Sequence, residues 1–221
     1  MRSLLDLLDE TDSALPLLRT WIDDPAGNGG VLLPPDQRMR IETLTGLQVT
    51  TRSMLGAIAY ETGGVAVADG FLRLLGGGLV RSLPQTAALT GAPLDGSYPD
   101  VIVVADDVLG GLFALNGGRF GAGRPGEVFH LAADDIAWAP LGVGYADFVE
   151  WCLTGDLKQL YEPFAHLDEY EARPRPAFDE AYAFYPFLWS REAREGRPSV
   201  SVVSAAESLR LRLDFCGFTV G

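Results

Sequence analysis

The sequence contains little of the chemistry from which metal and redox sites are built. Its 221 residues include two cysteines, Cys152 and Cys216, and two histidines, His130 and His166. The cysteines are too far apart in the chain for a zinc knuckle or a CxxC redox pair, so we expect free thiols in a reducing compartment. His130 is close in sequence to Asp134, but the three or four clustered ligands that zinc requires are missing. We therefore predict no metal and no cofactor.

The sequence motifs of common catalytic sites are also missing. It has no GxSxG motif, which positions a nucleophilic serine. The glycines at 76–78 lack the Lys and Ser or Thr of a phosphate-binding loop, and those at 117–126 form no GxGxxG after a strand. We predict that the protein is not an enzyme. The alternative is an enzyme or a small-molecule-binding protein with a pocket formed by residues 76–97 or by the aromatic segment 182–189.

Basic side chains are in the minority. The chain has 17 Lys and Arg against 30 Asp and Glu, a net charge of −13, and Lys158 is its single lysine. Nucleic acids and anionic membrane surfaces are recognised by basic stripes, so neither is an expected partner. A basic protein would be attracted to this chain. The alternative is that the charge serves solubility alone.

Long hydrophobic runs are absent as well. The most apolar stretch, residues 101–115, is interrupted by Asp106 and Asp107 and is too short to span a bilayer. The leucines near the N-terminus are interrupted by Asp6 and Asp9, so no signal-peptide core forms. We expect a cytoplasmic protein.

The order of the predicted elements indicates an α+β fold with a central twisted, mainly antiparallel sheet and flanking helices at both ends of the chain. We expect one domain over residues 1–221, with a core at about 36–165 and a C-terminal extension, 166–221, that packs on it. Helices are predicted from capping residues and apolar spacing at 4–8, 15–22, 36–46, 53–60 and 145–153. Strands are predicted in hairpins at 65–68 with 71–75, 101–104 with 112–115 and 127–131 with 136–139, and singly at 209–215. Residues 23–35, 76–97 and 116–126 are predicted loops.

Acidic residues occur at the predicted turns of two hairpins. Asp106 and Asp107 follow the strand at 101–104, and Asp134 and Asp135 follow the strand that begins with Glu127. If the hairpins are neighbours, these five side chains could form one negative patch at an edge of the sheet, suited to a basic protein. The alternative is that they are solvated turn residues without a partner.

Three segments resemble the SUKH superfamily of bacterial immunity-type proteins. Residues 101–115 resemble its central hairpin, Gly63 and Gly64 its glycine pair after a helix, and residues 145–151 its closing helix. The resemblance covers residues 36–165 roughly and implies toxin neutralisation or another protein-binding role. It implies no catalytic residue.

The whole chain also resembles a bacterial family known as domain of unknown function 2625. The segments that carry this resemblance are residues 47–53, 60–64, 81–84 and 185–189. The resemblance implies the α+β fold described above and no particular activity. We therefore expect a non-catalytic protein-binding module of toxin-immunity type, with a homo-oligomer as a further possibility.

Overall fold

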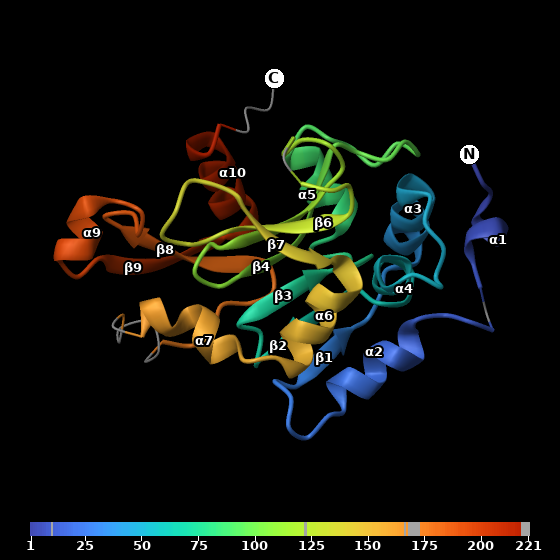
Figure 1. Ribbon diagram of the computed structural model, residues 1–221, viewed down its shortest axis with the longest axis horizontal. Helices are drawn as coiled ribbons and strands as arrows, with labels where there is room; N and C mark the ends of the chain where they lie inside the picture. The colour runs from blue at the N-terminus through green and yellow to red at the C-terminus, as the bar shows by residue number, and fades with distance from the viewer. Residues whose placement is uncertain (10, 122, 166, 168–172, 218–221) are drawn as a thin grey trace.

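A seven-stranded antiparallel sheet forms the centre of the protein (Figure 1). The computed structural model describes residues 1–9, 11–121, 123–165, 167 and 173–217. The strands lie side by side in chain order: β1 (Gly30–Leu33), β2 (Gly64–Val67), β3 (Leu72–Leu75), β4 (Val101–Asp107), β5 (Leu112–Asn116), β6 (Glu127–Leu131) and β7 (Ala139–Gly144). Helices flank this sheet, so the predicted α+β class is confirmed.

Two of the predicted hairpins form as expected. The turn between β2 and β3 has positive φ angles at Ala68, Asp69 and Gly70, a conformation that Asp-Gly sequences favour. The hairpin of β4 and β5 is also present, but its register shifts between Val103 and Ala105. Such a bulge changes which residues of a strand point to a given face. Asp106 therefore lies on the same face as Val103.

One face of the sheet carries the larger apolar core. The helices α2 (Leu15–Ile22), α4 (Met54–Glu61) and α6 (Tyr145–Thr154) pack together on this side (Figure 1). Phe148 and Cys152 of α6 are fully buried in one cluster with Ile102, Leu74 and Phe113 of the strands. Helix α7 (Leu157–Tyr161) and a 3-10 turn, η1 (Glu162–Phe164), continue this layer. The amphipathic pattern at 145–153 thus predicted the central helix of this face.

The opposite face is covered by α5 (Leu83–Leu89) and α10 (Ala205–Phe215), which contact each other above the sheet (Figure 1). Leu209 and Leu213 of α10 pack on Val101 and Leu112. These two leucines are four residues apart and therefore share one side of the helix. Helix α10 thus forms the second, smaller core together with residues of the sheet.

Two further helices complete the N-terminal end, α1 (Leu4–Leu7) and α3 (Gln37–Leu47), with α3 packed against α4. Helix α3 begins where predicted, because the Asp36 side chain accepts hydrogen bonds from the backbone N–H groups of Arg38 and Met39. Among the helices in the described ranges, none has the length and apolar character needed to cross a bilayer.

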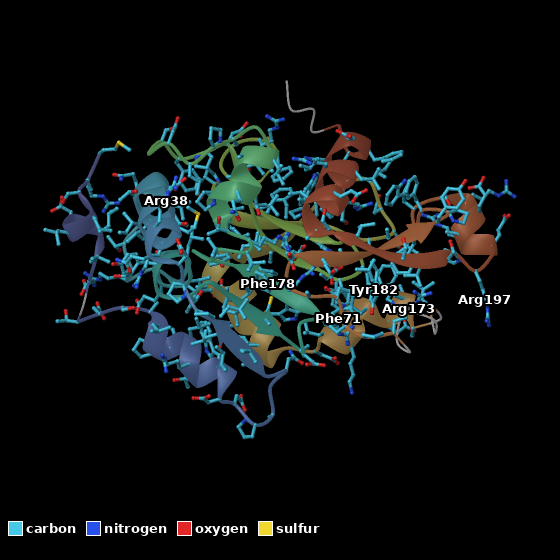
Figure 2. The ribbon with its side chains drawn as sticks, turned by 180° about the vertical axis from the view of Figure 1, so that it is seen from behind. Arg38, Phe71, Arg173, Phe178, Tyr182 and Arg197 are labelled. Atoms are coloured by element: carbon cyan, nitrogen blue, oxygen red, sulfur yellow. The ribbon has the colours of Figure 1, made fainter. Side chains whose placement is uncertain are left out.

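The C-terminal extension folds back on the sheet. It contains β8 (Glu180–Tyr185), α9 (Arg191–Glu195) and β9 (Ser199–Ser204), and the two strands form a separate antiparallel ribbon. The backbone N–H of Tyr182 donates to the carbonyl of Val108 at 2.8 Å, which joins β8 to the turn after β4. Phe178, labelled in Figure 2, lies against Gly64 of β2, where a Cβ atom would come within 2.6 Å of its ring.

A buried ionic cluster holds this extension in place. The fully buried Arg73 guanidinium of β3 donates to both carboxylate oxygens of Asp106 on β4, at 3.0 and 2.9 Å. It also donates to the carbonyls of Ala177 and Glu180 in the extension. Arg81 lies 2.7 Å from the same carboxylate. Every nitrogen of the Arg73 guanidinium is therefore occupied, Nε and Nη2 by β4 and Nη1 by the extension.

Several predicted elements differ from the structure. Residues 209–215 form part of α10 rather than a strand, because the Ser204 hydroxyl accepts from the N–H of Glu207 and starts a helix there. The predicted loops 23–35 and 76–97 contain β1 and α5. The strand predicted at 136–139 begins at Ala139 and continues to Gly144. Helices α5 and α10 both begin at a serine cap, Ser82 and Ser204, which are local signals that the predictions for these segments did not use.

We predict that Asp106→Asn destabilises the protein by about 3–5 kcal/mol, because two guanidinium groups would lose their counter-charge in the interior. Equilibrium urea unfolding gives the difference. Asp100→Asn is the matched control, since Asp100 is exposed and pairs with Arg119 at the surface, where such a pair contributes about 0–1 kcal/mol. Equal losses for the two variants would contradict the structural role of the cluster.

Candidate functional site

The predicted acidic patch is only partly assembled. The hairpins of β4–β5 and β6–β7 lie in one sheet, and their turns emerge at the same end of it, as expected. Glu127 does not join them, because it begins β6 and pairs with Gly144 at the other end of the strands. Glu127 therefore does not form one patch with the turn residues, contrary to the expected arrangement.

Asp106 and Asp107 are not surface residues, contrary to the prediction. They are 3% and 1% exposed. The Asp106 carboxylate accepts hydrogen bonds from Arg73 and Arg81 in the buried ionic cluster. The sequence contained these arginines, but their meeting with Asp106 depends on the pairing of β3 with β4 and was not predicted. Neither aspartate is available to a partner in this conformation.

Asp107 stabilises the turn between β4 and β5. Its Oδ1 accepts the backbone N–H groups of Leu109 and Gly111, both at 2.9 Å, and its Oδ2 accepts the hydroxyl of Tyr161 at 3.0 Å. Burial raises the pKa of Asp107, against the lowering effect of these hydrogen bonds. Gly111 is required here, because a Cβ atom would lie 2.2 Å from Asp107 Oδ2. The hydrogen bonds of Asp107 thus stabilise the fold of this turn.

Asp134 and Asp135 remain at the surface, half-buried and exposed respectively. Asp135 Oδ1 accepts the N–H groups of Ile136 and Ala137 at 2.7 and 3.0 Å, the hydrogen bonding of a turn. The backbone of this turn is held by Arg212 of α10, which donates to the carbonyls of Ala132 and Asp135. Two of the five predicted acidic side chains are thus placed near each other at the surface.

His130 and Cys152, the histidine and the buried cysteine of the described residues, both lie in apolar surroundings. His130 stacks on Phe113 with ring centroids 4.4 Å apart, and burial lowers its pKa to about 4. Cys152 is fully buried, which raises the pKa of its thiol and keeps it protonated. No group of three or more candidate metal ligands occurs among the described residues. His166 lies outside the described residues.

Several cavities border the sheet. One, about 470 Å³, is lined by residues that include Phe71, Tyr161 and the exposed Lys158 and Arg175. A second, about 270 Å³, is lined mainly by apolar residues of β7, α6 and α7. A smaller one, about 110 Å³, is lined by the aromatic residues of the segment 182–189 and by α10. The segment 182–189, one of the two that the alternative assigned to a ligand pocket, thus borders a small cavity.

The β8–β9 ribbon presents an open strand edge. β8 is bound on one side by β9 and on the other by the Val108 carbonyl, whereas β9 pairs with no strand other than β8 among the described residues. The sequence of β9 is Ser-Val-Ser-Val-Val-Ser, without charge, proline or glycine. Val202 is 46% exposed. An uncharged edge strand of this kind can pair with a strand of another chain.

The two outer strands of the large sheet are less suited to pairing. β7 contains Pro140 and two glycines, which interrupt a hydrogen-bond ladder. β1 is four residues long and is followed directly by Pro34 and Pro35. β9 is therefore the described edge best suited to bind an added strand.

Comparison with known proteins assigns the family. Residues 4–207 match the family described as "Protein of unknown function DUF2625". The chain belongs to this family. A DUF2625 relative from Escherichia coli (strain K12), "Putative uncharacterized protein YbfG", is 39% identical over 196 residues, which cover 88% of this chain and 89% of the relative. An "Uncharacterized protein" of Haemophilus influenzae (strain ATCC 51907 / DSM 11121 / KW20 / Rd) is 36% identical over 165 residues, 73% of this chain and 72% of the relative.

The DUF2625 match extends through β8, α9 and β9 to the first residues of α10. The ribbon with the open edge therefore belongs to the part of the chain that defines the family. This result is independent of the SUKH resemblance, which concerned residues 36–165.

We predict that the wild type loses folding stability at acid pH through His130, and that His130→Phe removes this loss. The folded state lowers the pKa of His130 from 6.5 to about 4, so the unfolded chain binds the proton first as the pH falls. The wild type should thus lose about 3 kcal/mol between pH 6.5 and 4 through this residue.

Urea unfolding at pH 7 and pH 4.5 measures the effect, and Phe preserves the stacking on Phe113. The stability difference between variant and wild type should shift in favour of the variant at the lower pH. The same difference at both pH values would show that His130 does not titrate in this way.

Proposed function

We propose that this DUF2625 protein is a non-catalytic protein-binding module that binds an extended segment of a partner as an additional strand on β9. The observation that carries the proposal is the open, uncharged edge of β9, whose only strand partner in the described structure is β8. Strand addition provides backbone hydrogen bonds to any extended segment, and side chains near the edge then provide specificity.

The charges around β9 favour a basic partner. Three carboxylates surround its Ser204 end: Glu180 pairs opposite Ser204, Asp179 accepts the N–H of Ala205 through its carbonyl, and Glu207 lies in the first turn of α10. Asp179 and Glu207 are exposed. A strand with apolar residues along Val202 and a Lys or Arg at this end would complement the edge. The net charge of −13 would increase its rate of association.

An immunity-type role, in which the partner is a toxin, is the specific form of this function that the SUKH resemblance implies. The net charge supports it, because a basic toxin would be attracted to an acidic inhibitor. Asp134 and Asp135 are retained in the proposal as a second acidic contact, whereas the buried Asp106 and Asp107 are not.

We predict that Val202→Lys abolishes or weakens partner binding at least about tenfold, since a lysine on an edge strand opposes strand pairing. The tagged wild type and the variant are used to capture partners from cells that contain the protein natively, at low and high salt. Each captured basic protein is then purified and its affinity measured.

Val31→Lys is the matched control, because Val31 is 62% exposed on β1, the edge of the other sheet. The proposal expects a basic protein that the wild type and the Val31 variant capture and the Val202 variant loses. Equal capture by both variants would overturn it. So would a wild-type dimer that Val202→Lys dissociates, because the edge would then serve self-association.

A further inference from the structure

Arg212 is a buried cation with unused hydrogen-bond donors. Its side chain projects from α10 and is 3% exposed. Nη2 donates to the carbonyls of Ala132 and Asp135, both at 2.6 Å, and the guanidinium lies over the Trp189 ring, 4.5 Å from the centroid. Nε and Nη1 are buried and have no hydrogen-bond partner among the described residues. Burial lowers the pKa of Arg212 to about 10, so the side chain is still charged at neutral pH.

The comparison with Arg73 indicates what Arg212 lacks. Arg73 is equally buried, but it has a carboxylate counter-charge and three carbonyl acceptors. Arg212 has carbonyl acceptors at one nitrogen only, and no carboxylate of the described chain forms an ion pair with it. An unpaired buried charge is strongly unfavourable, so a group that completed the hydrogen bonds of Nε and Nη1 would be bound favourably.

A cavity lies at Arg212. The space of about 110 Å³ is enclosed between β8, the segment after it, α10 and the turn between β4 and β5. Its apolar wall includes Tyr182, Phe184 and Trp189, and its polar groups include Glu207 and Ser208 in addition to Arg212. Figure 2 shows Tyr182 where the C-terminal ribbon meets the large sheet. The cavity therefore combines an aromatic wall with one cation.

We propose that this cavity binds a small monocarboxylate with a compact apolar body, whose carboxylate pairs with Nε and Nη1 of Arg212. Trp189 covers one face of the guanidinium, so the carboxylate approaches in its plane, where the free N–H groups point. The aromatic wall receives the apolar body. Arg212 provides one positive charge and Glu207 also lines the cavity, so a ligand with a single negative charge is favoured over a dianion such as phosphate. The cavity shares Val203 and Glu207 with the Ser204 end of β9, but the binding of a carboxylate there does not depend on the proposed protein partner.

The test is isothermal titration of the full chain with benzoate and isobutyrate, compared with the neutral benzamide and isobutyramide. We expect saturable binding of at least one carboxylate, and at least tenfold weaker binding of the matching amide and of phosphate. Arg212→Gln should reduce carboxylate affinity at least tenfold. Arg210→Gln is the control, because Arg210 is an exposed arginine on the same helix, and its replacement should leave the affinity unchanged.

A second variant keeps the test decisive if Arg212→Gln fails to fold. Ser208→Leu places a larger side chain in the cavity and leaves Arg212 intact, so it should also abolish carboxylate binding. The proposal is overturned if neither carboxylate binds at millimolar concentration. It is also overturned if amide and carboxylate bind equally, or if carboxylate affinity survives both Arg212→Gln and Ser208→Leu.

Discussion

The ionic cluster of Arg73, Asp106 and Arg81 joins the two parts of this protein. Asp106 provides the single carboxylate that both guanidinium groups share, and Arg73 adds hydrogen bonds to the carbonyls of Ala177 and Glu180. The hairpins of the sheet are formed by neighbouring segments of the chain. The extension, in contrast, is attached to the sheet through the Arg73 guanidinium, a charge that would be strongly unfavourable if it were unpaired in the interior. The position of β8, and with it β9 and α10, depends on this contact.

The docked extension provides both features to which we assign function. β9 is an edge because β8 is its one strand partner in the described structure, while the other side of β8 contacts the turn after β4. The cavity at Arg212 exists because α10 returns over the turn between β6 and β7 while β8 closes it from the side. The DUF2625 match, residues 4–207, includes β8 and β9, so the ribbon belongs to the part of the chain that matches the family, whereas Arg212 lies beyond it.

Arg73 and Arg212 are both buried, but burial alone does not show what either residue does. Arg73 is satisfied at every nitrogen and acts as a structural link, whereas Arg212 is satisfied at one nitrogen and stacked on Trp189. The same distinction applies to the acidic residues. Asp106 and Asp107 are buried and bound to structural partners, whereas Asp134 and Asp135 remain near the surface. The assignment of each charged residue depends on its partners.

Local sequence determined the elements whose signals act over a few residues. Asp36 caps α3, Asp69 and Gly70 turn between β2 and β3, and the apolar spacing at 145–153 gives α6. These could be predicted because caps, turns and helical faces are formed by neighbours in the chain. The net charge and the absence of catalytic motifs were equally visible in the sequence.

Tertiary structure decided the rest, because it depends on residues far apart in the chain. The alternating pattern at 209–215 fits a strand, yet contacts of Leu209 and Leu213 with the sheet and the Ser204 cap favour a helix. Asp106 has the sequence context of an exposed turn, and only the pairing of β3 with β4 and the bulge at Val103 place it beside Arg73. The open edge of β9 and the cavity at Arg212 likewise exist only once the extension is docked.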